Sequence, residues 1–216
     1  MLHHNDYEVD NMSAKNELVL EGTVLTAAQW SHDHQEKRFF RCYVEVPRLS
    51  GDSDILPVLL PEEKLPLMGQ GCCVRIQGQL RSFNNRTGVG NRLILTVYPL
   101  EITPATGEPC NRIILSGSIC KPPIFRRTPL GRSICDLMLA VPRHYGRADY
   151  LPVIAWGQLA MQARNLEVGS EITLEGRIQS RIYQKTTPSG VQERIAYEVS
   201  MMHFAEGCHL HAMSTE

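Results

Sequence analysis

Apolar and polar residues alternate along several short stretches of this chain, and the same stretches occur twice. Residues 16–24 read NELVLEGTV, and residues 111–119 read NRIILSGSI. Both segments have the period of two that is typical of a strand with one buried face. Both also place a glycine at the same point, Gly22 in the first and Gly117 in the second, 95 residues apart. The pattern therefore indicates an internal repeat.

Further matches follow in the same order. VEVPR at 44–48 corresponds to LAVPR at 139–143, and Pro57 corresponds to Pro152, both at the offset of 95 residues. GCCVRIQG at 71–78 corresponds to GSEITLEG at 169–176 at an offset of 98 residues, with the added residues in a segment expected to be helical. A repeat of this length predicts two copies of one structural unit.

Each unit is predicted to contain three strands, a short helix and two further strands, because alternating segments are separated by turn-forming residues. The strands of the first unit are expected at 16–24, 38–46, 55–60, 73–82 and 92–102, with a helix at 62–68. Those of the second are expected at 111–119, 133–141, 151–156, 171–183 and 194–204, with a helix at 158–166. This order is that of the OB-fold, a five-stranded Greek-key barrel, so the predicted fold class is all-β, with two tandem five-stranded OB-fold barrels.

The predicted organisation places a disordered arm at 1–15 and the first barrel at 16–104. A linker is expected at 105–110, because two prolines and a glycine occur in PATGEP. The second barrel is expected at 111–206 and a tail at 207–216. The glycine in each first strand suits a barrel strand that must bend sharply.

Charge and composition narrow the possible functions. The net charge of the whole chain is −1, but the second unit carries an excess of Lys and Arg while the first is close to neutral. The seven cysteines show no C-x-x-C pair, so neither a metal site nor a disulfide framework is expected. We find no catalytic motif, cofactor motif, signal peptide or long apolar run, and the chain is expected to be a cytoplasmic non-enzyme.

Residues 111–204 resemble the bacterial single-stranded DNA-binding protein family, including its primosomal replication protein N branch. The resemblance rests on NRIILSGSICKPP, PLGRSICDLMLAV, YLPVIAWGQLAMQA and VGSEITLEGRIQSRIY, which occur in the family's order. It implies an OB-fold that binds single-stranded DNA with little sequence preference in replication, recombination or repair. Since the family usually assembles four barrels, it also implies a homodimer here. The family's acidic, Phe-terminated recruiting tail is replaced by HLHAMSTE.

A sequence-tolerant site for single strands needs aromatic rings for base stacking and cations for the phosphates. By motif position, the family's stacking aromatics correspond to Tyr145, Tyr150, Trp156 and Tyr183, although Trp156 is equally suited to core packing. The predicted cationic contacts of the second unit are Arg112, Arg126, Arg127, Arg143, Arg147, Arg177, Arg181 and Lys185. Weaker contacts are expected in the first unit from Trp30, Phe40, Arg41, Arg81 and Arg86.

The two units are not expected to bind equally well. Where the second has Tyr150, Trp156 and Tyr183, the first has Ile55, Pro61 and Asn85, so the second barrel is predicted to be the stronger DNA site. Two other readings stay open. The barrels could bind replication or recombination proteins as a primosome-type adaptor, or they could bind single-stranded RNA, since a fold alone does not choose its ligand.

Overall fold

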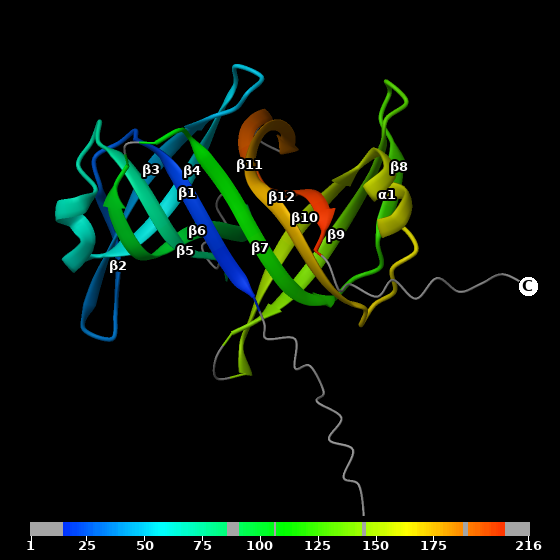
Figure 1. Cartoon of the computed structure of the whole chain (residues 1–216), viewed down its shortest axis with the longest axis horizontal. Coiled ribbons are helices and arrows are strands. Elements are labelled where there is room, and N and C mark those ends of the chain that lie inside the picture. The colour runs from blue at the N-terminus through cyan, green and yellow to red at the C-terminus, as the bar shows by residue number, and fades with distance from the viewer. Residues whose placement is uncertain (1–14, 86–90, 106, 144–145, 188–189, 206–216) are drawn as a thin grey trace, which may run out of the picture.

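The protein, seen in a computed structural model, consists of two similar β-barrel halves that lie side by side (Figure 1). The structure describes residues 15–85, 91–105, 107–143, 146–187 and 190–205. Tyr145 and Arg86 lie outside these residues, as do the predicted tail and all of the predicted arm except Lys15.

The first half has six strands and one short helix. Its elements are β1 (Asn16–Val24), β2 (Gln29–His34), β3 (Lys37–Pro47), β4 (Ser53–Pro61), the 3₁₀ helix Glu62–Leu67, β5 (Cys73–Asn84) and β6 (Leu93–Pro104). The second half repeats the order with β7 (Cys110–Ile119), β8 (Ile124–Arg127), β9 (Ser133–Pro142), β10 (Ala148–Trp156), helix α1 (Gly157–Ala163), β11 (Glu171–Thr187) and β12 (Gly190–Phe204).

The predicted fold class is confirmed, and the predicted strands all occur with small changes at their ends. The difference lies in the loop after the first strand of each half. This loop forms an additional short strand, β2 or β8, that pairs with the strand following it. A strand that exposes nearly all its side chains, as β2 does, needs no alternation of apolar and polar residues. The sequence pattern therefore does not predict this strand.

The core of each half is formed by strands in which buried and exposed residues alternate. In β3, Cys42, Val44 and Val46 point inward, while the residues between them are partly exposed. The same period of two in β7 buries Ile113 and Leu115. These side chains belong to one hydrophobic cluster that continues from one half into the other.

The halves are joined through their first strands. Strand β1 pairs antiparallel with β7, from Asn16 opposite Leu115 to Glu21 opposite Cys110. All twelve strands therefore form one sheet, with the order β2-β3-β4-β6-β5-β1-β7-β11-β12-β10-β9-β8. The order is a palindrome of equivalent strands, so an approximate twofold axis passes between β1 and β7, which lie at the centre of Figure 1.

The repeated glycines are needed where two strands come into close contact. A Cβ atom on Gly22 would lie 2.3 Å from the carbonyl oxygen of Glu45, and one on Gly117 would lie 2.4 Å from that of Ala140. Strands β1 and β7 change partners here, because each pairs with β5 or β11 along most of its length and with β3 or β9 at its end. The glycine therefore permits the strand crossing that closes each barrel.

The asparagine that opens each repeat also has a structural role. The Asn16 side chain donates to the carbonyl oxygen of Leu80 at 2.8 Å and accepts from its N–H at 2.9 Å. Asn111 makes the same pair of bonds with the backbone of Ile178, at 2.7 and 2.9 Å. Each side chain thus adds one rung to the hydrogen-bond ladder between the first and fourth long strands of its half.

Candidate nucleic-acid interface

Strand β10 of the second half presents two aromatic side chains on one face. Its alternation buries Leu151, Val153 and Ala155 in the core, and the opposite face carries Tyr150 and Trp156. Tyr150 is 49% exposed and Trp156 is 37% exposed. Both rings are thus available for contact with a flat ligand.

The strand that carries Tyr150 is held by the first half of the chain. The backbone N–H of Tyr150 donates to the hydroxyl of Ser82 in β5 at 2.8 Å. The preceding residue, Asp149, is fully buried and accepts from the N–H of Ser82 at 2.5 Å and from Arg81 at 3.2 Å. Arg143 of the second half also bonds to Asp149, at 2.6 Å, and to the carbonyl oxygen of Ser82, at 3.0 Å.

A second arrangement of the same kind lies on the other side of the approximate twofold axis. Asp54 in β4 is 1% exposed and accepts from Arg48 of its own half at 2.8 Å and from Arg177 of the second half at 2.9 Å. The N–H of Ser180 donates to Asp54 at 2.9 Å. The hydroxyl of Ser180 accepts from the N–H of Ile55 at 3.3 Å.

We call these two groups the Asp54 anchor (Arg48, Asp54, Arg177, Ser180) and the Asp149 anchor (Arg81, Ser82, Arg143, Asp149). Each consists of a buried carboxylate with one arginine from each half, so its charge is compensated by ion pairs and hydrogen bonds. The hydrogen bond with Asp54 raises the pKa of the Arg48 guanidinium. The anchors fix the fourth long strand of each half against the third long strand of the other half.

The anchors change the interpretation of three predicted phosphate contacts. Arg143, Arg177 and Arg81 are partly buried and bonded to Asp149 or Asp54. An arginine used in this way is a poor phosphate ligand, because breaking the pair would leave a buried carboxylate without its partner. These three residues belong to the junction between the halves, and their contact with DNA stays a prediction.

The other predicted cations of the second half lie on the surface in two groups. Three of them form ion pairs within the second half, Arg112 with Glu175, Arg126 with Asp136 and Arg181 with Glu198. The side chains of Arg127, Arg147 and Lys185 are exposed. The second group is the better source of phosphate contacts, because no described carboxylate has to be displaced from them.

Tyr183 lies at the border between the halves. It is half-buried, and its hydroxyl donates to Asn91 of the first half at 3.0 Å. The Arg181 guanidinium lies 5.7 Å from the centre of its ring. The long hairpin of β11 and β12 thus reaches across to the segment just before β6.

Three of the first-half residues that are predicted to contact DNA lie on β2 and β3. Trp30 is 58% exposed on β2, and its indole N–H donates to Asp33 at 2.9 Å. Phe40 is half-buried beneath the Arg38 guanidinium, at 5.4 Å from the ring centre. Arg41 is exposed on β3.

Two adjoining hollows of about 200 and 360 Å³ lie between the halves and share the lining residues Asn91, Leu93, Leu95 and Tyr197. We call them together the inter-half trough. Two of its aromatic residues, Phe83 and Tyr197, were not singled out from the sequence. Tyr197 occupies the strand position that corresponds to Leu95 in the first half, so an alignment of the last strands could have revealed it.

These features define the class of protein. It is a tandem OB-fold protein, and the strand faces and loops of such barrels are the surfaces on which OB-folds bind extended ligands. Residues 110–205 match the model of the Single-strand binding protein family. The second half of the chain is therefore similar to that family.

Individual relatives agree with this assignment. The chain is 36% identical over 81 residues to Single-stranded DNA-binding protein 2 of Listeria innocua, an alignment that covers 34% of this chain and 51% of the relative. It is 34% identical over 80 residues to the Single-stranded DNA-binding protein of Halalkalibacterium halodurans, covering 34% of this chain and 48% of that protein. The chain thus spans about half the length of the curated relatives it matches.

A solved structure resembles nearly the whole chain. The wild-type single-stranded DNA binding protein from Thermus aquaticus superimposes with a TM-score of 0.71 at 21% identity, covering 89% of this chain and 92% of that chain. The likeness supports the fold of both halves. In addition, no helix within the described residues is long and apolar enough to span a lipid bilayer.

Proposed function

We propose that this chain binds single-stranded DNA with little sequence preference. The observation that carries the proposal is the pair of exposed rings, Tyr150 and Trp156, on one face of β10 in the half that is similar to the family. Base stacking on such rings suits any sequence, because every base has a flat face. The exposed Arg127, Arg147 and Lys185 would neutralise phosphates.

A matched pair of variants tests this function. Tyr150→Ala removes a stacking ring, and Ile55→Ala removes an exposed apolar side chain at the equivalent position of the first half. The expected effect of Tyr150→Ala on the Kd for labelled oligo-dT is a rise of about fivefold to 100-fold, the range for loss of one base stack. Ile55→Ala is expected to change the Kd less than twofold. Equal effects of the two substitutions would argue against stacking on β10.

Salt provides a second test of the same function. Because neutralised phosphates release counterions, the affinity should fall as the salt concentration rises. An affinity that is independent of salt would exclude phosphate contacts as a major contribution.

In the cell, we propose that the protein protects or presents single strands in replication, recombination or repair, as a homodimer with four barrels. Light scattering with and without oligo-dT tests the assembly. Competition with single-stranded RNA and duplex DNA tests the ligand class. Retention of DNA affinity in Tyr150→Ala and Trp156→Ala together would favour an adaptor that contacts other proteins.

A further inference from the structure

The lining of the inter-half trough carries charge of one sign. Among the described residues that line it, four are cationic and none carries a carboxylate; the four are Arg41, Arg92, Lys185 and Arg194. Several arginines elsewhere on the surface are paired with acidic side chains, as Arg38 is with Glu62. Cations gathered in a hollow raise the local concentration of anions. The trough is therefore suited to a segment that carries several carboxylates.

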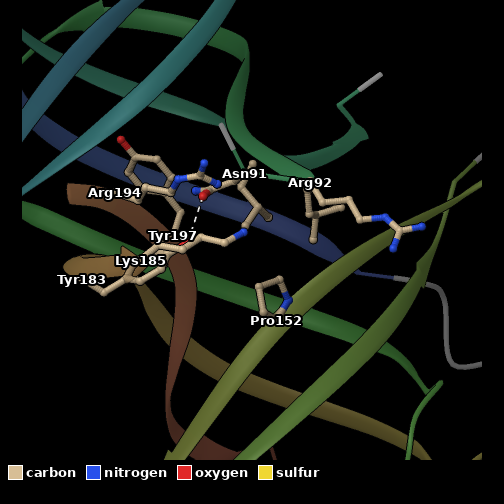
Figure 2. Close-up of a pocket in the computed structure, with 10 residues that line it drawn as sticks. Asn91, Arg92, Pro152, Tyr183, Lys185, Arg194 and Tyr197 are labelled. Atoms are coloured by element: carbon tan, nitrogen blue, oxygen red, sulfur yellow. Dashed lines mark hydrogen bonds between the residues drawn. The ribbon is translucent and has the colours of Figure 1, made fainter. Parts of the chain in front are cut away.

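The part of the trough shown in Figure 2 has a wall that is held in place by hydrogen bonds. Tyr183 and Lys185 of the β11–β12 hairpin lie beside Asn91, and Pro152 lies across the hollow. The dashed line marks the hydrogen bond from the Tyr183 hydroxyl to Asn91. Asn91 also donates to the carbonyl oxygen of Ile195 at 2.5 Å. The cationic hairpin is thus fixed to the segment just before β6.

The larger of the two hollows adds apolar and aromatic walls. Tyr43, Phe83 and Tyr197 line it together with Pro57, and Arg41 belongs to the same lining. Hollows of this kind bind groups that offer apolar area together with a few well-placed polar contacts. An occupant that suits the whole trough therefore combines carboxylates with apolar or aromatic side chains.

The sequence that precedes the first strand has this combination. Residues 1–14 contain three acidic side chains and neither Lys nor Arg. The three acids are Asp6, Glu8 and Asp10, and they alternate with Tyr7 and Val9. In an extended chain, successive side chains point to opposite sides. Residues 6–10 can therefore present three carboxylates to the cations and two apolar side chains to the apolar walls.

This acidic segment enters the fold close to the trough. Asn16, the first residue of β1, is bonded to the backbone of Leu80 in β5. Because β1 and β5 are antiparallel, the chain before Asn16 leads toward Phe83, which lies in the trough wall, roughly 10 Å further along β5. The chain from Asp10 to Asn16 spans at most about 20 Å. The acidic segment can therefore reach the trough of its own chain.

We propose that residues 6–10 dock into the inter-half trough of the same chain, with their carboxylates against Arg41 and Lys185 and Tyr7 against the apolar wall. Lys185 is also a proposed phosphate contact, so the docked segment competes with DNA. The competition rests on the proposed function, whereas the docking does not. Exposed ion pairs are individually weak, so a stronger polyanion displaces the segment. Its covalent link makes the contact independent of protein concentration.

Carbodiimide coupling of the intact chain locates the acidic segment. The reagent joins a carboxylate to a lysine amine that it touches, so the expected product links a peptide from residues 1–14 to Lys185. Lys121 is the control, because it is exposed and follows β7, whose Ser116 N–H donates to the carbonyl oxygen of Lys15 at 2.8 Å. A segment that is not docked reaches Lys121 as well. Equal coupling to the two lysines would overturn the docking.

The origin of the docked carboxylates is tested in the same experiment. In a mixture of isotope-labelled and unlabelled protein, both peptides of each product should come from one chain. Products that combine the two labels would show that a second copy supplies the segment, and would overturn the proposal. Coupling of Lys185 to Glu206 or Glu216 in place of residues 6–10 would overturn it too.

Neutral variants test the competition with DNA. Asp6→Asn, Glu8→Gln and Asp10→Asn together should lower the Kd for oligo-dT about twofold to tenfold, as expected if the segment fills the trough in about half to nine-tenths of the molecules. The control variant combines three substitutions of exposed acids outside the segment, Glu63→Gln, Glu101→Gln and Glu171→Gln.

The control variant removes the same charge and should change the Kd less than twofold. Equal Kd values for the two triple variants would overturn the competition. If no form of the chain bound oligo-dT, the proposed function would fail, and the coupling to Lys185 would still decide whether the segment docks.

Discussion

The Arg177 guanidinium of the second half lies 2.9 Å from the buried carboxylate of Asp54 in the first half. The equivalent contact across the approximate twofold axis joins Arg81 to Asp149, but the two arginines do not occupy equivalent positions. The fourth long strand reads Gln79-Leu80-Arg81 in the first half and Arg177-Ile178-Gln179 in the second. The order of Arg and Gln is exchanged, yet each arginine reaches the buried aspartate of the other half and bonds to the nearby glutamine.

The anchors should contribute strongly to stability. Asp54→Asn is expected to lower the free energy of unfolding by about 3 kcal/mol, because it leaves two arginines facing a neutral group in a buried site. Urea unfolding followed by circular dichroism measures this change. Glu175→Gln, which breaks the exposed pair with Arg112, is the control and should cost less than about 1 kcal/mol. Similar losses in both variants would contradict a special role for the anchor.

The serine hydroxyls allow a test of how the halves cooperate. Ser82→Ala removes the acceptor of the Tyr150 N–H, and Ser180→Ala removes the acceptor of the Ile55 N–H. Each should cost about 1 kcal/mol of stability. Only Ser82→Ala should raise the Kd for oligo-dT, by about threefold to tenfold, because only Tyr150 is an exposed ring. Fluorescence titration checks the Kd, and Ser82→Thr should restore it. Equal Kd values for the two Ala variants would show that Ser82 does not position Tyr150.

The asparagine bonds predict a loss of stability that is the same in both halves. Asn16→Ala and Asn111→Ala each leave a backbone N–H and a carbonyl oxygen without their partner. Each substitution should therefore lower the free energy of unfolding by about 1–3 kcal/mol. Thermal melts of the two variants and of Lys121→Ala, an exposed control in the second half, test this. An unchanged melting temperature in either asparagine variant would contradict the role of its side-chain bonds.

Tyr197 predicts a dependence of stability on alkaline pH. Its pKa in the folded chain is about 12, raised by burial above the ordinary value of 10. Its stabilising effect is therefore fully present below pH 10 and is lost as the pH rises through about 12, because the unfolded phenol loses its proton first. The loss is at most about 2 kcal/mol, since the ring is only partly buried. Chemical unfolding at pH 9 and pH 11.5 should show a smaller decline in Tyr197→Phe than in wild type. Identical declines would contradict the assignment.

The sequence was sufficient to predict the frame of the fold. Alternating apolar and polar residues reflect the local geometry of a strand. Glycines and prolines recur with them at constant offsets, so the repeat identified the long strands and both barrels. Asp54 and Asp149, with Arg48 and Arg143, follow the same offset and could have been recognised as a repeated pair.

The contacts between the halves could not be predicted in the same way. An arginine on a strand has the same pattern whether it faces phosphate or a buried carboxylate, and the partner of Arg177 lies 123 residues away. The trough depends on this long-range packing too, since Tyr43 and Tyr197 come from different halves. The DNA contacts of Tyr150, Trp156 and the exposed cations remain predictions that the proposed binding experiments test.

The pairing of β1 with β7 takes place within a single polypeptide. Two identical barrels on separate chains would come apart on dilution, whereas these halves remain together at any protein concentration. Because they are parts of one chain, they can also carry different side chains at equivalent places, as Tyr150 and Ile55 do. The resulting surface is asymmetric: β10 presents the exposed rings of Tyr150 and Trp156 in the second half, whereas Ile55 stands at the position of Tyr150 in the first.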